Sequence, residues 1–133
     1  MAGGMIPKYA DGADTGWVRL TNTGVFHPRT ASDAYGLFIR KLGNVVTIIA
    51  RQIQLDTELP AETYGSSVNL ITNLDTKYRP AYTVNSFAGW PTNAGRTVTH
   101  VQITETGNIT FFAPPQTTWP TNVSIDFTQT FLV

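Results

Sequence analysis

The residues of this chain that best suit ligand chemistry by type and spacing lie between Gly89 and Arg96. In this segment Trp90, Asn93 and Arg96 supply an aromatic face, a planar amide and a guanidinium. Such a set suits a saccharide, because a sugar ring packs its apolar face on an aromatic ring while planar polar groups bind its hydroxyls. Arginine adds affinity for a phosphate group. The glycines predict a long exposed loop here. The alternative is that Trp90 anchors that loop on the core.

His100 extends the candidate site along the strand that follows. If Val101 and Ile103 point inward, His100 points outward and can join Arg96, because side chains alternate along a strand. A place in a subunit interface is the alternative. His27 is a weaker candidate in an early loop. Two distant histidines without Asp or Glu at ligand spacing predict no metal site, and the sequence indicates no cofactor.

The acidic residues give little support for catalysis. Glycoside hydrolysis needs two carboxylates about 5–10 Å apart. Glu58 and Glu62 share a predicted loop, but nothing in the sequence makes them converge. The chain lacks a Gly-x-Ser-x-Gly motif, a phosphate-binding loop and a dinucleotide fingerprint. We therefore expect a binding protein and not an enzyme.

The composition limits the class of partner. Nine Lys and Arg balance nine Asp and Glu, so nucleic acid is not an expected partner. The absence of cysteine excludes a disulfide framework and a thiolate zinc site. No run approaches the roughly 20 apolar residues of a membrane span, so we expect no membrane insertion. A hydrophobic content of 41% argues against disorder.

The residue bias predicts an all-β fold. The chain holds 21 Thr, eight Asn, 11 Gly and eight Pro, which favour strands joined by turns over helices. Seven or eight strands at short spacing predict an antiparallel β-sandwich or jelly-roll-like barrel. We expect residues 1–15 to be a linker or lead-in and residues 16–133 to form a single domain.

The clearest predicted element is a hairpin of residues 35–42 and 45–55. Gly43-Asn44 suits a two-residue turn of type II′ or I′, which places Leu42 opposite Val45. One face of the hairpin then carries Leu37, Ile39, Val46, Ile48 and Ala50, and the other carries Phe38, Leu42, Val45 and Ile49. Because both faces are apolar, we expect one to pack inside the domain and the other against another subunit.

Other strands are predicted at 16–21, 68–74, 82–87 and 123–131, with a second hairpin of 97–106 and 109–113. Gly107-Asn108 is expected to repeat the first turn. Residues 22–34 and 55–66 are expected to be loops, and residues 75–80 a non-helical turn before Pro80. Trp17 is expected in the core or an interface, and Trp119 at a loop corner in either setting. Tyr64 and Tyr82 are candidate rim aromatics.

Four segments in order carry a resemblance that covers roughly residues 14–133. They are Asp14-Thr-Gly-Trp-Val-Arg-Leu20, Tyr35-Gly-Leu-Phe-Ile-Arg-Lys-Leu-Gly-Asn-Val-Val-Thr-Ile48, Leu74-Asp-Thr-Lys-Tyr-Arg-Pro80 and Val101-Gln-Ile-Thr-Glu-Thr-Gly-Asn-Ile-Thr110. This layout resembles the C-terminal head domains of tail and baseplate proteins from siphophages of Gram-positive bacteria. One departure is Leu74-Asp75, where the family usually has Leu-Pro.

The resemblance implies a homotrimeric β-sandwich head in the virion, at the phage tail tip or baseplate. Such heads are often receptor-binding domains that hold a host cell-wall or surface polysaccharide without cleaving it. They contact other baseplate or tail proteins, and no saccharide contact transfers by position. Two rivals stay open: a structural trimeric module of the baseplate or tail fibre, and a fragment of a polysaccharide depolymerase.

Overall fold

The computed structural model describes residues 14–92 and 95–133, and within them the side chains of 14–88 and 99–133. The chain folds as an all-β antiparallel sandwich, as predicted. Its described strands are β1 (Val18–Leu20), β2 (Phe26–Pro28), β3 (Gly36–Leu42), β4 (Val45–Leu55), β5 (Ser67–Ile71), β6 (Val84–Thr92), β7 (Gly95–Ile103), β8 (Ile109–Phe112) and β9 (Ile125–Leu132). One turn of 3₁₀ helix, η2, spans Thr76–Tyr78.

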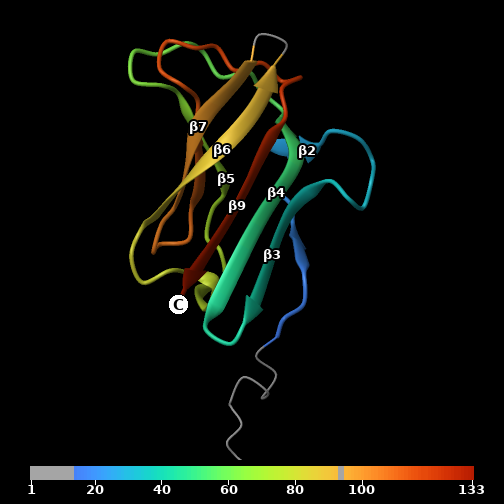
Figure 1. The fold of residues 1–133 in the computed structure, drawn as a ribbon, viewed down its shortest axis with the longest axis vertical. Helices are drawn as coiled ribbons and strands as arrows, with labels where there is room; N and C mark the ends of the chain where they lie inside the picture. The colour runs from blue at the N-terminus through green and yellow to red at the C-terminus, as the bar shows by residue number, and fades with distance from the viewer. Residues whose placement is uncertain (1–13, 93–94) are drawn as a thin grey trace, which may run out of the picture.

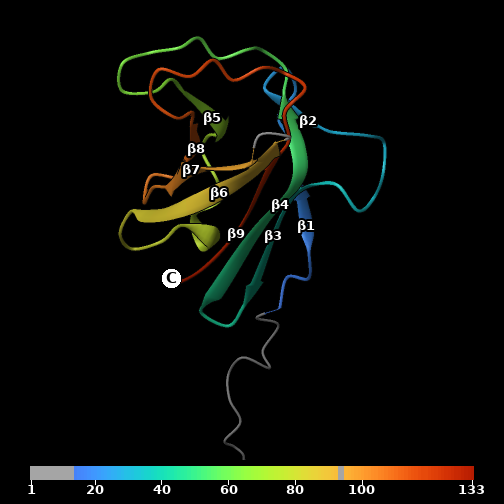
Figure 2. The same ribbon diagram turned by 45° about the horizontal axis from the view of Figure 1, so that its top comes forward.

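The strands follow the order β1-β3-β4-β9-β6-β7-β8-β5, with β2 paired to β4. We call β1, β2, β3, β4 and β9 the first sheet, and β5 to β8 the second sheet. The two sheets join at the pair Gly89 and Asp126, where β6 meets β9. Figure 1 shows β3, β4 and β9 side by side, with β6 and β7 crossing next to them. Figure 2 shows β6, β7, β8 and β5 in succession on one side of the molecule.

The predicted first hairpin is confirmed with its register. Leu42 pairs with Val45, and Phe38 pairs with Ile49. Gly43 has a φ of 62°, while Asn44 is not among the non-glycine residues with positive φ, which indicates a type II′ turn. The five residues expected on the inner face are all buried. On the other face Leu42 and Val45 are exposed, and Phe38 and Ile49 are half-buried.

A β-bulge in β4 changes which residues face the core. The register to β9 shifts between Ala50 and Ile53, and Gln52 adopts a φ of 47°. The Asp126 carboxylate accepts a hydrogen bond from the Gln52 backbone N–H at 2.8 Å. The shift keeps Ile53 and Leu55 inward although they lie on the alternate phase of the strand.

The core lies between the two sheets and is aliphatic and aromatic. Trp119 is fully buried and meets Phe111 edge to face, with ring centroids 4.9 Å apart. Such a pair adds about 0.5–1.5 kcal/mol to the free energy of unfolding beyond the burial of its area. The last strand alternates as predicted, with Ile125, Phe127 and Phe131 buried. The sequence left the setting of both Trp17 and Trp119 undecided. Trp119 lies in the core, whereas Trp17 is 48% exposed.

Several predicted boundaries are wrong, and tertiary pairing explains each. Residues 22–34 include β2, because its three residues pair with the end of β4. The predicted loop at 89–96 belongs instead to β6 and β7, which pair as far as Thr92 and Gly95. Beyond Gly89, the described backbone pairs of β6 are with β7 alone, so this part of β6 is an edge segment. Proline lacks a backbone N–H, and an edge segment tolerates Pro91 because one side of the strand needs no hydrogen bond.

The second hairpin has a longer loop than predicted. β7 ends at Ile103, paired with Ile109, so five residues and not two connect the strands. The Thr104 hydroxyl accepts a hydrogen bond from the Asn108 N–H at 3.1 Å, which stabilises the wider loop. Residues 76–78 form η2, so the turn before Pro80 contains one helical turn. Arg79 itself is extended, as a residue before proline should be.

Candidate functional site

A row of aromatic side chains crosses the outer face of the second sheet. Phe87 on β6 pairs with His100 on β7, and His100 pairs with Phe112 on β8. The His100 and Phe112 rings stack at 4.9 Å with an interplanar angle of 18°. Phe87 is 75% exposed. The three rings therefore lie in a row across three neighbouring strands, and we call this row the aromatic strip.

A row of polar side chains runs beside the aromatic strip. Asn85 pairs with Gln102, Gln102 with Thr110, and Thr110 with Asn69. The Asn85 Oδ1 atom accepts from Gln102 Nε2 at 3.2 Å and lies 2.8 Å from His100 Nε2. The Thr110 hydroxyl donates to Asn69 Oδ1 at 2.7 Å. The hydrogen bonds hold amide groups in fixed orientations next to the rings.

The aromatic strip forms part of a hollow of about 330 Å³ on this face. Its described lining residues are Tyr64, Phe87, Thr99, His100, Phe112, Ala113, Pro114 and Pro115. Tyr64, a predicted rim aromatic, is 92% exposed beside it. The Thr99 hydroxyl donates to the Phe112 carbonyl and ties β7 to β8 beneath the rings. We call this hollow with Asn85 and Gln102 the platform.

Strand alternation explains why the platform faces outward. Val101 and Ile103 are fully buried. His100 directly precedes Val101 on the same strand, so its side chain points away from the core. The orientation predicted for His100 is confirmed. Gly65, with a φ of 90°, lets the chain turn after Tyr64 and lie against Ala113, whose N–H donates to the Ser66 carbonyl at 2.8 Å. This contact fixes two walls of the hollow relative to each other.

Of the four predicted site residues, the structure places the side chain of His100 alone. Trp90 lies on β6 and Arg96 on β7, where their backbones pair with Thr97 and Pro91. The side chains of Trp90 and Arg96 lie outside the described ones, and Asn93 lies outside the described residues. Their role in binding stays a prediction.

Sequence reasoning missed Phe87, Phe112, Asn85 and Gln102 as members of one surface. All four lie in or next to strands that were predicted, and the alternation around Val101 marks their face. Their meeting depends on the register of β6, β7 and β8, which the pattern within one strand does not give.

The described lining of the platform carries no Asp, Glu, Lys or Arg. The shifted pKa values among the described groups belong to other sites. The Thr83 hydroxyl donates to Glu105 at 2.8 Å and lowers the pKa of that carboxyl. The guanidinium of Arg40 bonds Asp14 through Nε at 3.0 Å and Nη2 at 2.7 Å, and it lowers the pKa of Asp14 to about 2.

A second hollow, of about 250 Å³, lies on the outer face of the first sheet. It is lined by Trp17, Arg40, Leu42, Val45 and Thr47. The Arg40 guanidinium lies 5.9 Å from the centre of the Trp17 ring. Leu132, paired with Val45 across β4 and β9, is 69% exposed next to it. The described lining of this hollow contains no Asn or Gln, whereas the platform includes Asn85 and Gln102.

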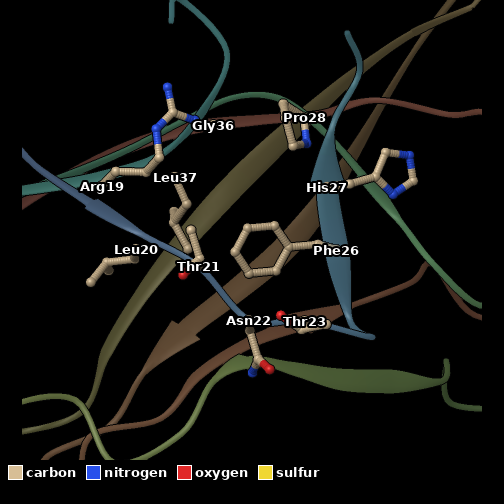
Figure 3. A pocket seen from close by; sticks show the side chains of 10 residues that line it. All are labelled: Arg19, Leu20, Thr21, Asn22, Thr23, Phe26, His27, Pro28, Gly36 and Leu37. Atoms are coloured by element: carbon tan, nitrogen blue, oxygen red, sulfur yellow. The ribbon is translucent and has the colours of Figure 1, made fainter. Parts of the chain in front are cut away.

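A third hollow, of about 130 Å³, lies beside β1 and β2 (Figure 3). The Phe26 ring extends into it, while His27 points to the other side of β2. His27 Nδ1 contacts the Asp56 carboxylate instead. Asn22 is also engaged, since its Nδ2 donates to the Leu70 carbonyl at 3.0 Å. The polar groups of His27 and Asn22 are thus engaged in contacts within the fold.

No group of three or more His, Cys, Asp or Glu among the described residues could hold a metal ion. No helix in the described part of the chain is long and apolar enough to cross a membrane.

The comparison with solved structures identifies the fold. The chain is similar to the crystal structure of the head domain of phage bIL170, presented among the receptor-binding domains of lactococcal phages. The TM-score is 0.62 at 15% sequence identity, over 89% of this chain and 97% of that one. No protein-family model and no curated protein matches the sequence. The chain therefore has the fold of a phage receptor-binding head domain.

Proposed function

We propose that this chain is the receptor-binding head of a phage tail protein and binds a host surface saccharide on the platform without cleaving it. The observation that carries the proposal is the aromatic strip beside a row of fixed amides. The fold it shares with the bIL170 head domain supports the same class of role. The proposed location is the virion, at the tail tip or baseplate.

The platform offers what a sugar requires. Phe87 and Phe112 present apolar ring surface for the C–H face of a pyranose. Asn85 Nδ2 and Gln102 Oε1 have no partner among the described residues, so they can bind hydroxyls. Trp90, Asn93 and Arg96 remain proposed contributors from the adjoining hairpin. These groups bind and orient a sugar, whereas hydrolysis requires two carboxylates about 5–10 Å apart.

We also propose that the domain acts as a homotrimer. The apolar outer face of the first sheet supports this assignment, because Leu42, Val45 and Leu132 expose large side chains there. One sugar on an open platform should bind weakly. Three heads per trimer and several trimers per virion would then raise the avidity by a factor of about 10² or more.

The second candidate function is a structural trimeric module that contacts other baseplate or tail proteins. The same apolar face favours it, since a scaffold needs protein contacts and no sugar site. The two functions differ in what the platform does, so a platform variant separates them.

The test is staining of lactococcal and other Gram-positive cells with labelled protein, with extracted wall polysaccharide as competitor. We expect a few strains to stain and their own polysaccharide to block the stain. Phe87→Ala should lower staining at least tenfold, while Tyr82→Ala, an equally exposed aromatic off the platform, should not. Trp90→Ala with Arg96→Ala tests the adjoining hairpin.

Absence of staining by a protein verified as folded and oligomeric would favour the scaffold. Staining that Phe87→Ala leaves unchanged would show that the sugar binds elsewhere. Release of reducing ends from the polysaccharide would support the depolymerase.

A further inference from the structure

We infer that His100 acts as a fixed hydrogen-bond acceptor, so that the platform selects a sugar unit that donates an N–H or O–H group to it and releases that unit when His100 is protonated. This inference rests on the proposed function and adds to it a hydrogen-bond donor on the ligand and a dependence on pH. It is built from the contacts of one imidazole ring.

Neighbouring side chains determine which ring nitrogen of His100 carries the proton. His100 Nε2 lies 2.8 Å from Asn85 Oδ1, a carbonyl oxygen that can only accept. Gln102 Nε2 donates to the same oxygen at 3.2 Å, which fixes the Asn85 amide with its oxygen toward both donors. His100 must therefore donate through Nε2–H. In the neutral ring Nδ1 then has a free lone pair.

The stacking of His100 and its place in the hollow determine where that lone pair is available. The ring is stacked on Phe112 at 4.9 Å, so it cannot rotate freely. Nδ1 has no hydrogen-bond partner among the described residues, and His100 lines the hollow. A ligand seated on the aromatic strip meets an acceptor at this position. It needs an N–H or O–H group there.

The charge of the His100 ring decides whether Nδ1 can accept a hydrogen bond. Around His100, β6 contributes Asn85 and Phe87, β8 contributes Phe112, and the wall contributes Tyr64 as its titratable group. No described carboxylate lines the hollow to stabilise an imidazolium. A ligand that covers the ring would desolvate that cation, and protonation would also turn Nδ1 from acceptor to donor. Both effects favour the neutral ring in the complex.

The expected consequence is loss of affinity on acidification. Histidine changes charge between about pH 5 and pH 8. We expect binding to labelled cells to fall about three- to tenfold from pH 8 to pH 5, the size of one lost hydrogen bond. His100→Gln retains an amide acceptor that does not titrate, so its binding should not vary with pH over this range. His27→Gln removes the other histidine and should leave the wild-type profile unchanged.

Asn85 is the positioning residue in this arrangement, and Asn85→Asp tests it. The carboxylate keeps an acceptor for Nε2–H but stabilises the imidazolium. Loss of binding should therefore begin at a higher pH in Asn85→Asp than in wild type. A role of Asn85 in structure alone would lower binding equally at every pH.

The tautomer itself can be measured without a ligand. With only two histidines in the chain, ¹⁵N spectra of the rings are assigned by His27→Gln and His100→Gln. At pH 8 we expect His100 to show a protonated Nε2 and an unprotonated Nδ1. A protonated Nδ1 would overturn the inference.

The outcomes separate this inference from the proposed function. Cells that bind wild type equally at pH 5 and pH 8 would leave the proposed function intact and overturn the inference. Cells that bind at no pH would overturn both. A fall in binding that His100→Gln abolishes and His27→Gln preserves would support both.

Discussion

The two outer faces of the sandwich have opposite chemistry although both are built from antiparallel strands. On the first sheet the solvent-exposed positions hold Leu42, Val45 and Leu132. The hydroxyls of Thr47 and Thr130 on this sheet are hydrogen-bonded to each other. On the second sheet the outward-facing positions hold aromatic rings and amides, and His100, Asn85 and Gln102 share one hydrogen-bond network. The first face suits another protein chain, and the second suits a polar ligand.

Under the proposed function, one face serves assembly and the other serves recognition. Protein interfaces have an apolar centre and a polar rim, and the first sheet has its ion pair of Asp14 and Arg40 at the edge near Trp17. Sugar sites need fixed polar groups beside rings, and the second sheet supplies them through strand register. The comparison therefore predicts that each face can be changed without disturbing the other.

The largest expected effect comes from placing charge on the first face. Val45→Glu with Leu132→Lys puts opposite charges on a cross-strand pair, which the folded monomer tolerates. In a subunit interface the same charges would lose their water, so we expect complete dissociation to monomer by light scattering. Staining of cells should fall about 100-fold through lost avidity, while binding of one sugar unit should not change.

The control places a charge on an exposed aromatic in the segment before β6. Tyr82→Glu should leave the oligomer intact. A wild-type protein that is already monomeric would contradict the assignment of the first face as an interface.

The next effect concerns the walls of the platform and compares two glycines. A Cβ at Gly65 would lie 2.3 Å from the Ala113 carbonyl oxygen, whereas a Cβ at Gly24 would meet nothing within 4 Å. Both have a left-handed φ, near 90°, so alanine at either costs about 1–2 kcal/mol of strain. Gly65→Ala should cost about 1–3 kcal/mol more, because Ala113 must move.

Urea unfolding of the two variants gives that difference directly. Gly65→Ala should also weaken ligand binding, since Tyr64 and Pro114 wall the hollow on either side of the contact. Gly24→Ala should not. Equal unfolding midpoints for the two variants would show that the chain around Ala113 relaxes without cost.

Much of the first sheet could be predicted from sequence because its signals are local. Alternation on both sides of Gly43-Asn44 defined a hairpin with its register, and the structure has the same pairs. The bulge after Ala50 and the pairing of β2 depend on contacts with β9 and β4, which are distant in sequence. The residue pattern within any one strand does not predict the bulge or this pairing.

The candidate site was harder to predict for the same reason. His100 was found because its neighbours Val101 and Ile103 indicate an inward face. Phe87 and Phe112 join it only through strand pairing. Pro91 made the segment near Trp90 resemble a loop, and only the edge position of that part of β6 explains why a strand accepts proline there.

The smallest expected effect concerns the ion pair at the edge of the first face. The Arg40 guanidinium lowers the pKa of Asp14 from the ordinary 3.8 to about 2. A carboxyl with a lowered pKa in the folded state stabilises the fold above its ordinary pKa, and this contribution disappears as the pH falls from about 4 to 2. A carbon-detected titration of the Asp14 carboxyl should show the lowered value.

Asp14→Asn should mimic the protonated state at neutral pH. Next to the pair, the Thr15 N–H donates to the Lys41 carbonyl and the Lys41 N–H donates to the Thr15 hydroxyl, each at 2.9 Å. Both amide hydrogens should therefore exchange a few-fold faster in the variant. Glu105→Gln removes an exposed carboxylate from the loop between β7 and β8 and should leave both amides unchanged. Faster exchange in both variants would mean that the two sheets respond together, and the independence of the two faces would be lost.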